Sequence, residues 1–141
     1  MLSVDSVEKG VVIDHIKAGT AMEIYQYLNL NKLDCSIAII KNVRSAKLGK
    51  KDIIKIEDRI DLDLNMLGYM DPNATVNIIE DGVITSKLKL SLPDRLVNII
   101  KCKNPRCITS AEQGIAQIFT LCDRDRRIYR CLYCEQEHQQ N

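Results

Sequence analysis

The sequence predicts an α+β fold in two unequal parts: a larger sheet-and-helix part and then a small all-β part. Two observations lead to this prediction. Short β-branched runs alternate with helical segments over residues 1–95, in the order βαββαββ. The pattern breaks around Leu92-Pro93, and five of the six cysteines lie beyond that point.

Each element of the first part is marked by a local signal. The run of residues 10–16 is apolar and β-branched and predicts the first strand, and Thr20 with Glu23 forms a capping box that predicts a helix after it. Asp81-Gly82 is a two-residue hairpin signal between the last two strands. The other expected elements are strands over residues 35–41, 52–57, 74–80 and 83–90, a basic loop over 44–51, and a short helix over about 61–70.

This order of elements predicts a ferredoxin-like α/β sandwich, βαββαβ with an extra hairpin strand, over residues 1–95. Right-handed crossovers then place the third and fourth strands on either side of the first. Residues 96–141 are too few to hold a core by burial alone, so this second domain is expected to need a metal or disulfides.

Composition narrows the class of protein. Twenty basic residues balance 19 acidic ones, and this small net charge of +1 does not favour a nucleic-acid binder. No stretch approaches the roughly 20 apolar residues that cross a bilayer, and the N-terminus lacks the features of a signal peptide. We therefore expect a cytoplasmic protein with reduced cysteines and no membrane partner.

Two short cysteine loops, C-x4-C at Cys102 and Cys107 and C-x2-C at Cys131 and Cys134, are separated by a strand-rich segment. Such loops can bring four thiolates to the corners of a tetrahedron, which is the ligand set of a structural zinc site. Four sulfurs leave no open position, so the metal is expected to fold a zinc-ribbon-like domain rather than to activate water. Iron accepts the same ligands, and the sequence alone leaves the two metals open.

The other candidate ligands are left outside this site. Cys35 lies in an apolar run and is interpreted as a buried hydrophobic residue, and Cys122 has no cysteine partner at ligand spacing. His138 follows Cys134 by four positions and is interpreted as a solvated tail residue.

Several polar residues fall on strands that the expected topology brings together. Taken singly, each is more simply a solvated charge or a residue at a sheet edge. Together, ammonium groups, an amide and an Asp-His pair could bind phosphates and a ribose or base edge. No nucleophile with a suggested base, no Gly-rich phosphate loop and no open metal position is evident, which favours binding over catalysis. These candidates are Asp14, His15, Lys51, Lys55, Asn77 and Lys87.

Five segments in order give the chain a family resemblance over nearly its whole length. They are Val12-Ile13-Asp14-His15-Ile16, Lys51-Asp52-Ile53-Ile54-Lys55-Ile56-Glu57, Ala74-Thr75-Val76-Asn77, Ser91-Leu92-Pro93-Asp94-Arg95 and the two cysteine pairs. With these segments the sequence resembles the regulatory chain of aspartate carbamoyltransferase, a non-catalytic subunit of an enzyme of pyrimidine biosynthesis.

The resemblance implies an N-terminal allosteric domain that binds CTP as inhibitor, with UTP in some members, and ATP as activator at one shared site. The lysines would meet the phosphates. Gly82 stands where the resemblance implies an aromatic residue, and this bears on effector preference. The implied nucleotide contacts are Val4, Asp5, Val7, Asp14, His15, Lys51, Lys55, Asn77, Ile79, Ile84 and Lys87.

For the second domain the resemblance implies one zinc on Cys102, Cys107, Cys131 and Cys134 and docking onto the catalytic chain. Asn104, Glu112 and Glu135 match positions near that contact, and Arg106 departs from the small polar residue implied there. Regulatory chains of this kind pair as homodimers and bridge two catalytic trimers into a dodecamer.

Two other classes of protein stay open at this point. A zinc-ribbon nucleic-acid-binding protein would fit the cysteines, although residues 102–141 mix basic with acidic side chains and offer few aromatic residues for base stacking. A small metalloenzyme or electron carrier with iron on the four thiolates is the second alternative.

Overall fold

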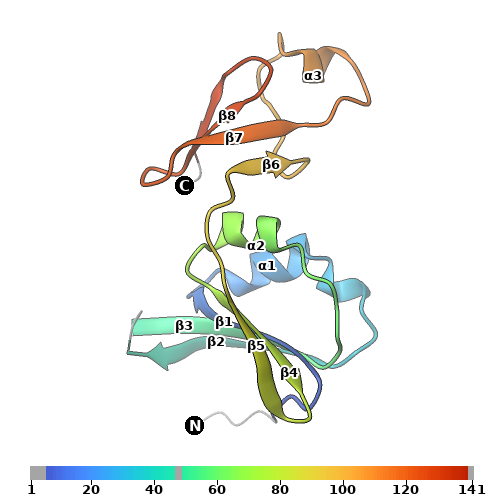
Figure 1. Cartoon of the computed structure of the whole chain (residues 1–141), viewed down its shortest axis with the longest axis vertical. Helices are drawn as coiled ribbons and strands as arrows, with labels where there is room; N and C mark the ends of the chain where they lie inside the picture. Colours follow the sequence, from blue (N-terminus) through green and yellow to red (C-terminus); the bar gives the residue numbers. More distant parts are fainter. Residues whose placement is uncertain (1–5, 47–48, 140–141) are drawn as a thin grey trace. The chain divides into compact units, whose positions relative to one another are not determined.

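The computed structural model describes residues 6–46 and 49–139. It divides into two compact units, Met1–Ser91 and Leu92–Asn141, called here the first and second units (Figure 1). The domain boundary predicted from the sequence, after residue 95, is four residues beyond this division and falls at the start of strand β6 (Arg95–Val97).

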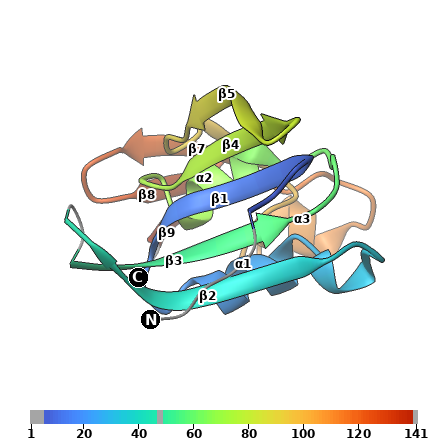
Figure 2. The same cartoon turned by 90° about the horizontal axis from the view of Figure 1, so that it is seen from below.

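The first unit is a five-stranded antiparallel sheet in the order β2-β3-β1-β4-β5, with its helices on one face (Figures 1 and 2). The third and fourth strands therefore flank the first, as predicted. Its elements are β1 (Gly10–Lys17), α1 (Ala21–Tyr27), the 3-10 helix η1 (Leu30–Lys32), β2 (Ile37–Ser45), β3 (Gly49–Ile56), α2 (Leu64–Met70), β4 (Thr75–Glu80) and β5 (Val83–Lys89).

The core of the first unit lies between the sheet and the two helices. Val11 and Ile13 on β1 and Ile54 on β3 lie on the side of the sheet that faces the helices, where they pack with Ile24 and Leu67. The opposite side of the sheet, here called the open face, carries the alternate residues of the same strands. No helix among the described residues is long and apolar enough to span a membrane.

The capping box predicted at Thr20 is wrong. Thr20 has helical backbone angles where an N-cap is normally extended, and its side chain makes no capping bond. The turn before α1 is bonded instead by the carboxylate of Asp52 on β3, which accepts from the amides of Gly19 and Ala21. The observed side-chain cap is at α2, where Asp63 accepts a bond from the Met66 amide at 3.0 Å, so this helix begins at Leu64 and not near residue 61.

The β2–β3 hairpin is longer than predicted. β2 continues through a bulge to Ser45 and β3 begins at Gly49, so most of the expected basic loop over residues 44–51 is paired strand. The polar composition of this segment suggested a loop, but both strands need only one covered face, and an exposed hairpin arm tolerates polar side chains.

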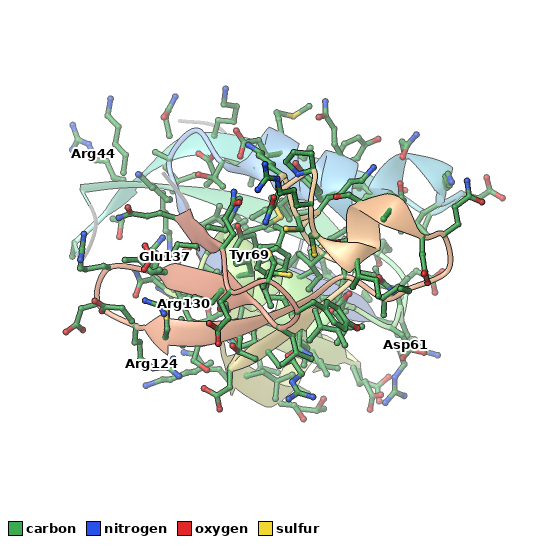
Figure 3. The ribbon with its side chains drawn as sticks, turned by 90° about the horizontal axis from the view of Figure 1, so that it is seen from above. Arg44, Asp61, Tyr69, Arg124, Arg130 and Glu137 are labelled. Atoms are coloured by element: carbon green, nitrogen blue, oxygen red, sulfur yellow. The ribbon has the colours of Figure 1, made fainter. Side chains whose placement is uncertain are left out.

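The second unit is a four-stranded antiparallel sheet in the order β6-β7-β8-β9. Its buried apolar side chains include Leu96, Phe119 and Tyr129. Figure 3 labels Arg130 and Glu137 on the neighbouring strands β8 and β9, where Nη2 and Oε1 are 2.8 Å apart. After β6 its elements are the four-residue helix α3 (Ile108–Ala111), β7 (Ile118–Asp123), β8 (Ile128–Cys131) and β9 (Glu137–Gln139).

Candidate metal centre and candidate binding face

The four predicted cysteines meet in the second unit. Cys102 and Cys107 lie in the connection between β6 and β7, and Cys107 is the residue before helix α3. Cys131 ends β8 and Cys134 lies in the turn before β9. Two loops far apart in the sequence are thus held together by the pairing of β6, β7 and β8.

The sulfur positions fit a tetrahedral metal. All four Sγ atoms lie within 4.8 Å of one another, with 3.6 Å between Cys102 and Cys134 and 3.7 Å between Cys107 and Cys131. A zinc–sulfur bond of about 2.3 Å gives a tetrahedron whose edges are about 3.8 Å. The thiol pairs therefore stand close to the spacing that four ligands of one such ion require, and no disulfide is formed.

Neighbouring groups prepare two of the thiols to act as thiolates. Backbone N–H donation from Gln136 lowers the pKa of Cys134 to about 7, and the Thr109 hydroxyl, 3.1 Å from Sγ, lowers the pKa of Cys107. Burial acts in the other direction, raising the pKa of Cys131 and, to about 12, that of Cys102. A cation among the four sulfurs would offset that cost.

Hydrogen bonds also fix the loops that carry these sulfurs. The Cys102 amide donates to Gln117 Oε1 at 3.0 Å, and the amide of Cys131 donates to the Gln136 carbonyl at 3.0 Å. The loops are therefore held by groups other than the sulfurs themselves, as hydrogen bonds around the ligand residues orient them in metal sites in general.

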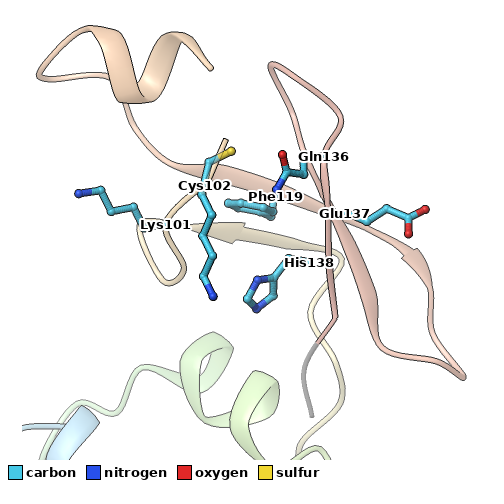
Figure 4. A pocket seen from close by; sticks show the side chains of 7 residues that line it. Lys101, Cys102, Phe119, Gln136, Glu137 and His138 are labelled. Carbon is cyan, nitrogen blue, oxygen red and sulfur yellow. The ribbon is translucent and has the colours of Figure 1, made fainter. Parts of the chain in front are cut away.

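Cys35 and Cys122 lie outside the cluster, as expected: Cys35 packs against the core of the first unit, and Cys122 is exposed and donates to the Ile128 carbonyl. The interpretation of His138 as a solvated tail residue is wrong. It lies on β9, half-buried, with its ring edge-on to Phe119 at 6.1 Å (Figure 4). Burial and the nearby Lys103 lower its pKa.

On the open face of the first unit, strand register aligns three predicted contacts, Lys55, Asn77 and Lys87, with Val12 between them. Val12 on β1 pairs with Lys55 on β3 and with Asn77 on β4, and Asn77 pairs with Lys87 on β5. Lys55, Val12, Asn77 and Lys87 therefore form one row across four strands. Within the described residues, neither Lys55 nor Lys87 takes part in a salt bridge.

A second polar group lies beside this row, at a bulge in β1. Asp14 and His15 together oppose the single residue Ile53, and His15 has a left-handed φ of 58°. The Asp14 carboxylate accepts the His15 amide at 2.6 Å and lies 3.0 Å from Lys51 Nζ. The His15 ring nitrogen Nδ1 lies 3.0 Å from the Thr75 hydroxyl.

Thr75 was missed by the sequence reasoning. A signal was present, because Thr75 and Asn77 are two positions apart on one strand and therefore share a face.

Asn77 stands out in the row because its Oδ1 atom is buried and has no hydrogen-bond partner among the described residues. An orphaned buried acceptor costs about 1–3 kcal/mol, so native structures rarely keep one without a use.

The remaining predicted contacts are placed unevenly. Ile79 and Ile84 pair across the β4–β5 hairpin, and Ile84 is exposed. Val7 is buried at 5% exposure, so a direct role in contacting a ligand is not evident from its side chain. Val4 and Asp5 lie outside the described residues.

The fold and the two sites define a two-domain protein: a ferredoxin-like unit with a polar open face, followed by a small four-cysteine metal-binding unit. Two family models match these parts. Residues 2–91 match the allosteric domain of the aspartate carbamoyltransferase regulatory chain, and residues 94–141 match its metal binding domain.

Curated proteins agree with this assignment. Regulatory chains of aspartate carbamoyltransferase from Clostridium tetani and Clostridium acetobutylicum are 51% and 52% identical, over 96% of this chain and 95% and 93% of theirs. The one from Bifidobacterium longum is 43% identical over 96% of this chain and 98% of its own. The chain therefore belongs to the family of aspartate carbamoyltransferase regulatory chains.

Membership of this family makes the chain a regulatory and not a catalytic subunit, with an allosteric and a metal-binding domain. The nucleic-acid-binding alternative considered from the sequence is not favoured by these matches.

Proposed function

We propose that the chain is the effector-sensing subunit of an aspartate carbamoyltransferase: it binds CTP, UTP and ATP on the open face of residues 1–95 and docks on the catalytic chain through residues 96–141. The observation that carries the nucleotide part is the row formed by Lys55, Asn77 and Lys87, with the cluster of Lys51, Asp14 and His15 beside it.

The chemistry of this face suits a nucleoside triphosphate. Lys55 and Lys87 have no carboxylate partner among the described residues, so their charges are available to a polyphosphate. The Asn77 side chain, whose Oδ1 has no partner among the described residues, would offer an acceptor and, after reorientation, donors to a ribose or base edge. The Asp14 carboxylate already holds Lys51, with 3.0 Å between Oδ1 and Nζ. This ion pair would limit how closely Lys51 approaches a phosphate.

Hydrophobic groups complete the proposed face. Ile79 and Ile84 form a pair at the hairpin, and Val12 lies in the centre of the row. Aliphatic side chains of this kind can support a base or the carbon edge of a ribose while lysines hold the charged end. We include Val4, Asp5 and Val7 in this site on the family resemblance alone.

We further propose that the occupant of the cysteine cluster is zinc, one ion per chain, in a purely structural role. Support comes from the spacing of the four sulfurs, which matches zinc–thiolate bonds and fills the coordination shell. When bound, the ion supplies folding free energy to the second domain and no chemistry.

The proposed partners are the catalytic trimer and a second regulatory chain, giving an assembly in the cytoplasm in which regulatory homodimers bridge two trimers. A nucleotide in such an assembly changes activity only through its differential affinity for two quaternary states. Couplings of this type are typically about 1–3 kcal/mol, enough to change activity several-fold.

The nucleotide part is tested by calorimetric titration of the zinc-loaded chain with CTP. Lys55→Ala is expected to weaken binding roughly tenfold, about 1.4 kcal/mol, and raised salt should reduce the difference. Lys32→Ala is the matched control, because Lys32 is an exposed lysine on η1 and not on the open face. Equal effects of the two substitutions would contradict the proposed site.

The docking part is tested by light scattering after gel filtration of the zinc-loaded chain mixed with aspartate carbamoyltransferase catalytic trimers. A zinc-dependent complex much heavier than the trimer is expected. No complex would leave a metal-binding chain whose partner is of another kind.

A further inference from the structure

Asp52 is a fully buried carboxylate on β3, and it faces the helices and not the open face. Its partners are three backbone amides: Oδ2 accepts from Gly19 at 2.9 Å and Ala21 at 3.3 Å, and Oδ1 accepts from Asn42 at 3.0 Å. No salt bridge among the described residues includes it. A buried charge held only by amides is costly to keep unless its geometry is used.

Those amides belong to two irregular places beside β3. Gly19 lies in the turn that joins β1 to α1, at a φ of 95°, and Ala21 is the first residue of α1. Asn42 lies in a bulge of β2, where Lys41 and Asn42 together oppose Asp52, and its φ is 60°. One carboxylate on β3 therefore bonds the bulge of β2 on one side and the turn after β1 on the other side.

The bulge of β1 lies one residue further along β3. Ile13 pairs with Ile54 and Ile16 pairs with Asp52, so Asp14 and His15 are the extra pair between them. In an unbroken strand His15 would point to the helices, because Ile13 and Asp14 alternate faces. The bulge lets His15 join Asp14 on the polar side, where its ring meets Thr75.

Lys51 is the residue next to Asp52 and points to the other side of the sheet. Its Nζ lies 3.0 Å from Asp14 Oδ1, the atom that also accepts the His15 amide. Contacts therefore run from the Asp52 backbone to Lys51, from Lys51 to Asp14, and from Asp14 to His15. Each step is a hydrogen bond, an ion pair or a covalent neighbour.

We infer that Asp52 is a positioning residue for the effector site: from the opposite side of the sheet it sets the strand geometry that presents Lys51, Asp14 and His15 together. This inference rests on the proposed nucleotide site. It assigns to Asp52 no contact with the ligand.

Asparagine at this position tests the inference with little change of shape. An amide has one oxygen and one NH2 group, so it cannot accept from all the amides that face Asp52, and its own donors would meet N–H groups. Either the Asn42 bond or the bonds to Gly19 and Ala21 are then lost. Since one such bond changes an equilibrium several-fold, CTP affinity is expected to fall roughly fivefold or more.

Leu67→Ala is the control, because Leu67 is fully buried on α2 and its loss destabilises the first unit without touching either bulge. It is expected to lower the melting temperature at least as much as Asp52→Asn and to leave CTP affinity unchanged. Equal weakening of CTP binding by both variants would mean that Asp52 is important for stability alone.

A second readout needs no nucleotide. The chain has two histidines, His15 in the first unit and His138 in the second, so the imidazole C2–H region of the proton NMR spectrum contains two signals. Asp52→Asn is expected to shift the His15 signal and to leave that of His138 in place. An unmoved His15 signal in folded Asp52→Asn would overturn the positioning role.

The two readouts keep the inference separate from the proposed function. If the wild-type chain does not bind CTP, the nucleotide site is wrong, and the His15 signal alone decides whether Asp52 positions the cluster. If Asp52→Asn does not fold, Asn42→Ala is the second variant, because alanine keeps the amide but resists a φ of 60°. It should weaken CTP binding in the same direction, and unchanged binding would refute the inference.

Discussion

Replacing Cys107 with alanine is expected to release the metal and unfold residues 92–141 while leaving residues 1–91 folded. Cys107 is 1% exposed and its sulfur is 3.7 Å from that of Cys131, so its loss removes one corner of the tetrahedron. The other three thiols would then hold the ion with an incomplete shell.

The loss of folding free energy is expected to be large, because few other groups stabilise the second unit. Among its described residues, five apolar side chains other than cysteine are buried, and at about 1.5–3 kcal/mol each they contribute about 8–15 kcal/mol. A structural zinc ion contributes about 10–16 kcal/mol at neutral pH. The ion is therefore expected to stabilise the second unit about as much as its whole apolar core. That core consists of Leu92, Leu96, Phe119, Ile128 and Tyr129.

The assay combines metal content by mass spectrometry with amide NMR spectra, which report the two units separately. Cys122→Ala is the control, because Cys122 is an exposed cysteine outside the cluster. This variant should keep its metal and the chemical-shift dispersion of a folded second unit. A Cys107→Ala protein that retains one tightly bound ion and a folded second unit would refute the reasoning.

Two further substitutions test the packing and capping of the first unit by urea unfolding. Gly68→Ala is expected to destabilise it by about 1–3 kcal/mol, because the added Cβ would collide with the Ser91 carbonyl oxygen. In an open helix the same change stabilises by roughly 1 kcal/mol, so a more stable variant would contradict this close approach. Asp63→Ala is expected to cost about 1 kcal/mol through the lost cap of α2, and Thr20→Ala clearly less, because Thr20 makes no capping bond. Equal losses would show that the assigned caps are wrong.

Periodicity in the sequence was sufficient to predict the first unit as a ferredoxin-like sheet. Apolar residues recur on one side of each strand, as Val11 and Ile13 do, and the turn at Asp81-Gly82 fixes the last hairpin. These are local signals, since one covered face and one tight turn are each specified by neighbouring residues.

The cysteine cluster was equally accessible from the sequence. Ligand spacing is a property of short loops, so Cys102, Cys107, Cys131 and Cys134 could be grouped before their sulfurs were placed. The capping prediction failed where a distant group acted on a local preference. Thr20 carries a capping signal, but its backbone angles are helical, and the turn before α1 is bonded by the distant carboxylate of Asp52.

The sequence by itself determined the strand order, the four-cysteine cluster and the family of this protein, because each depends on patterns carried by adjacent residues or by spacing. Only the tertiary structure decided which side chains share the open face. The bulges at His15 and Asn42 arise from pairing between strands and from Asp52, and a bulge reverses the face on which every later residue of its strand lies.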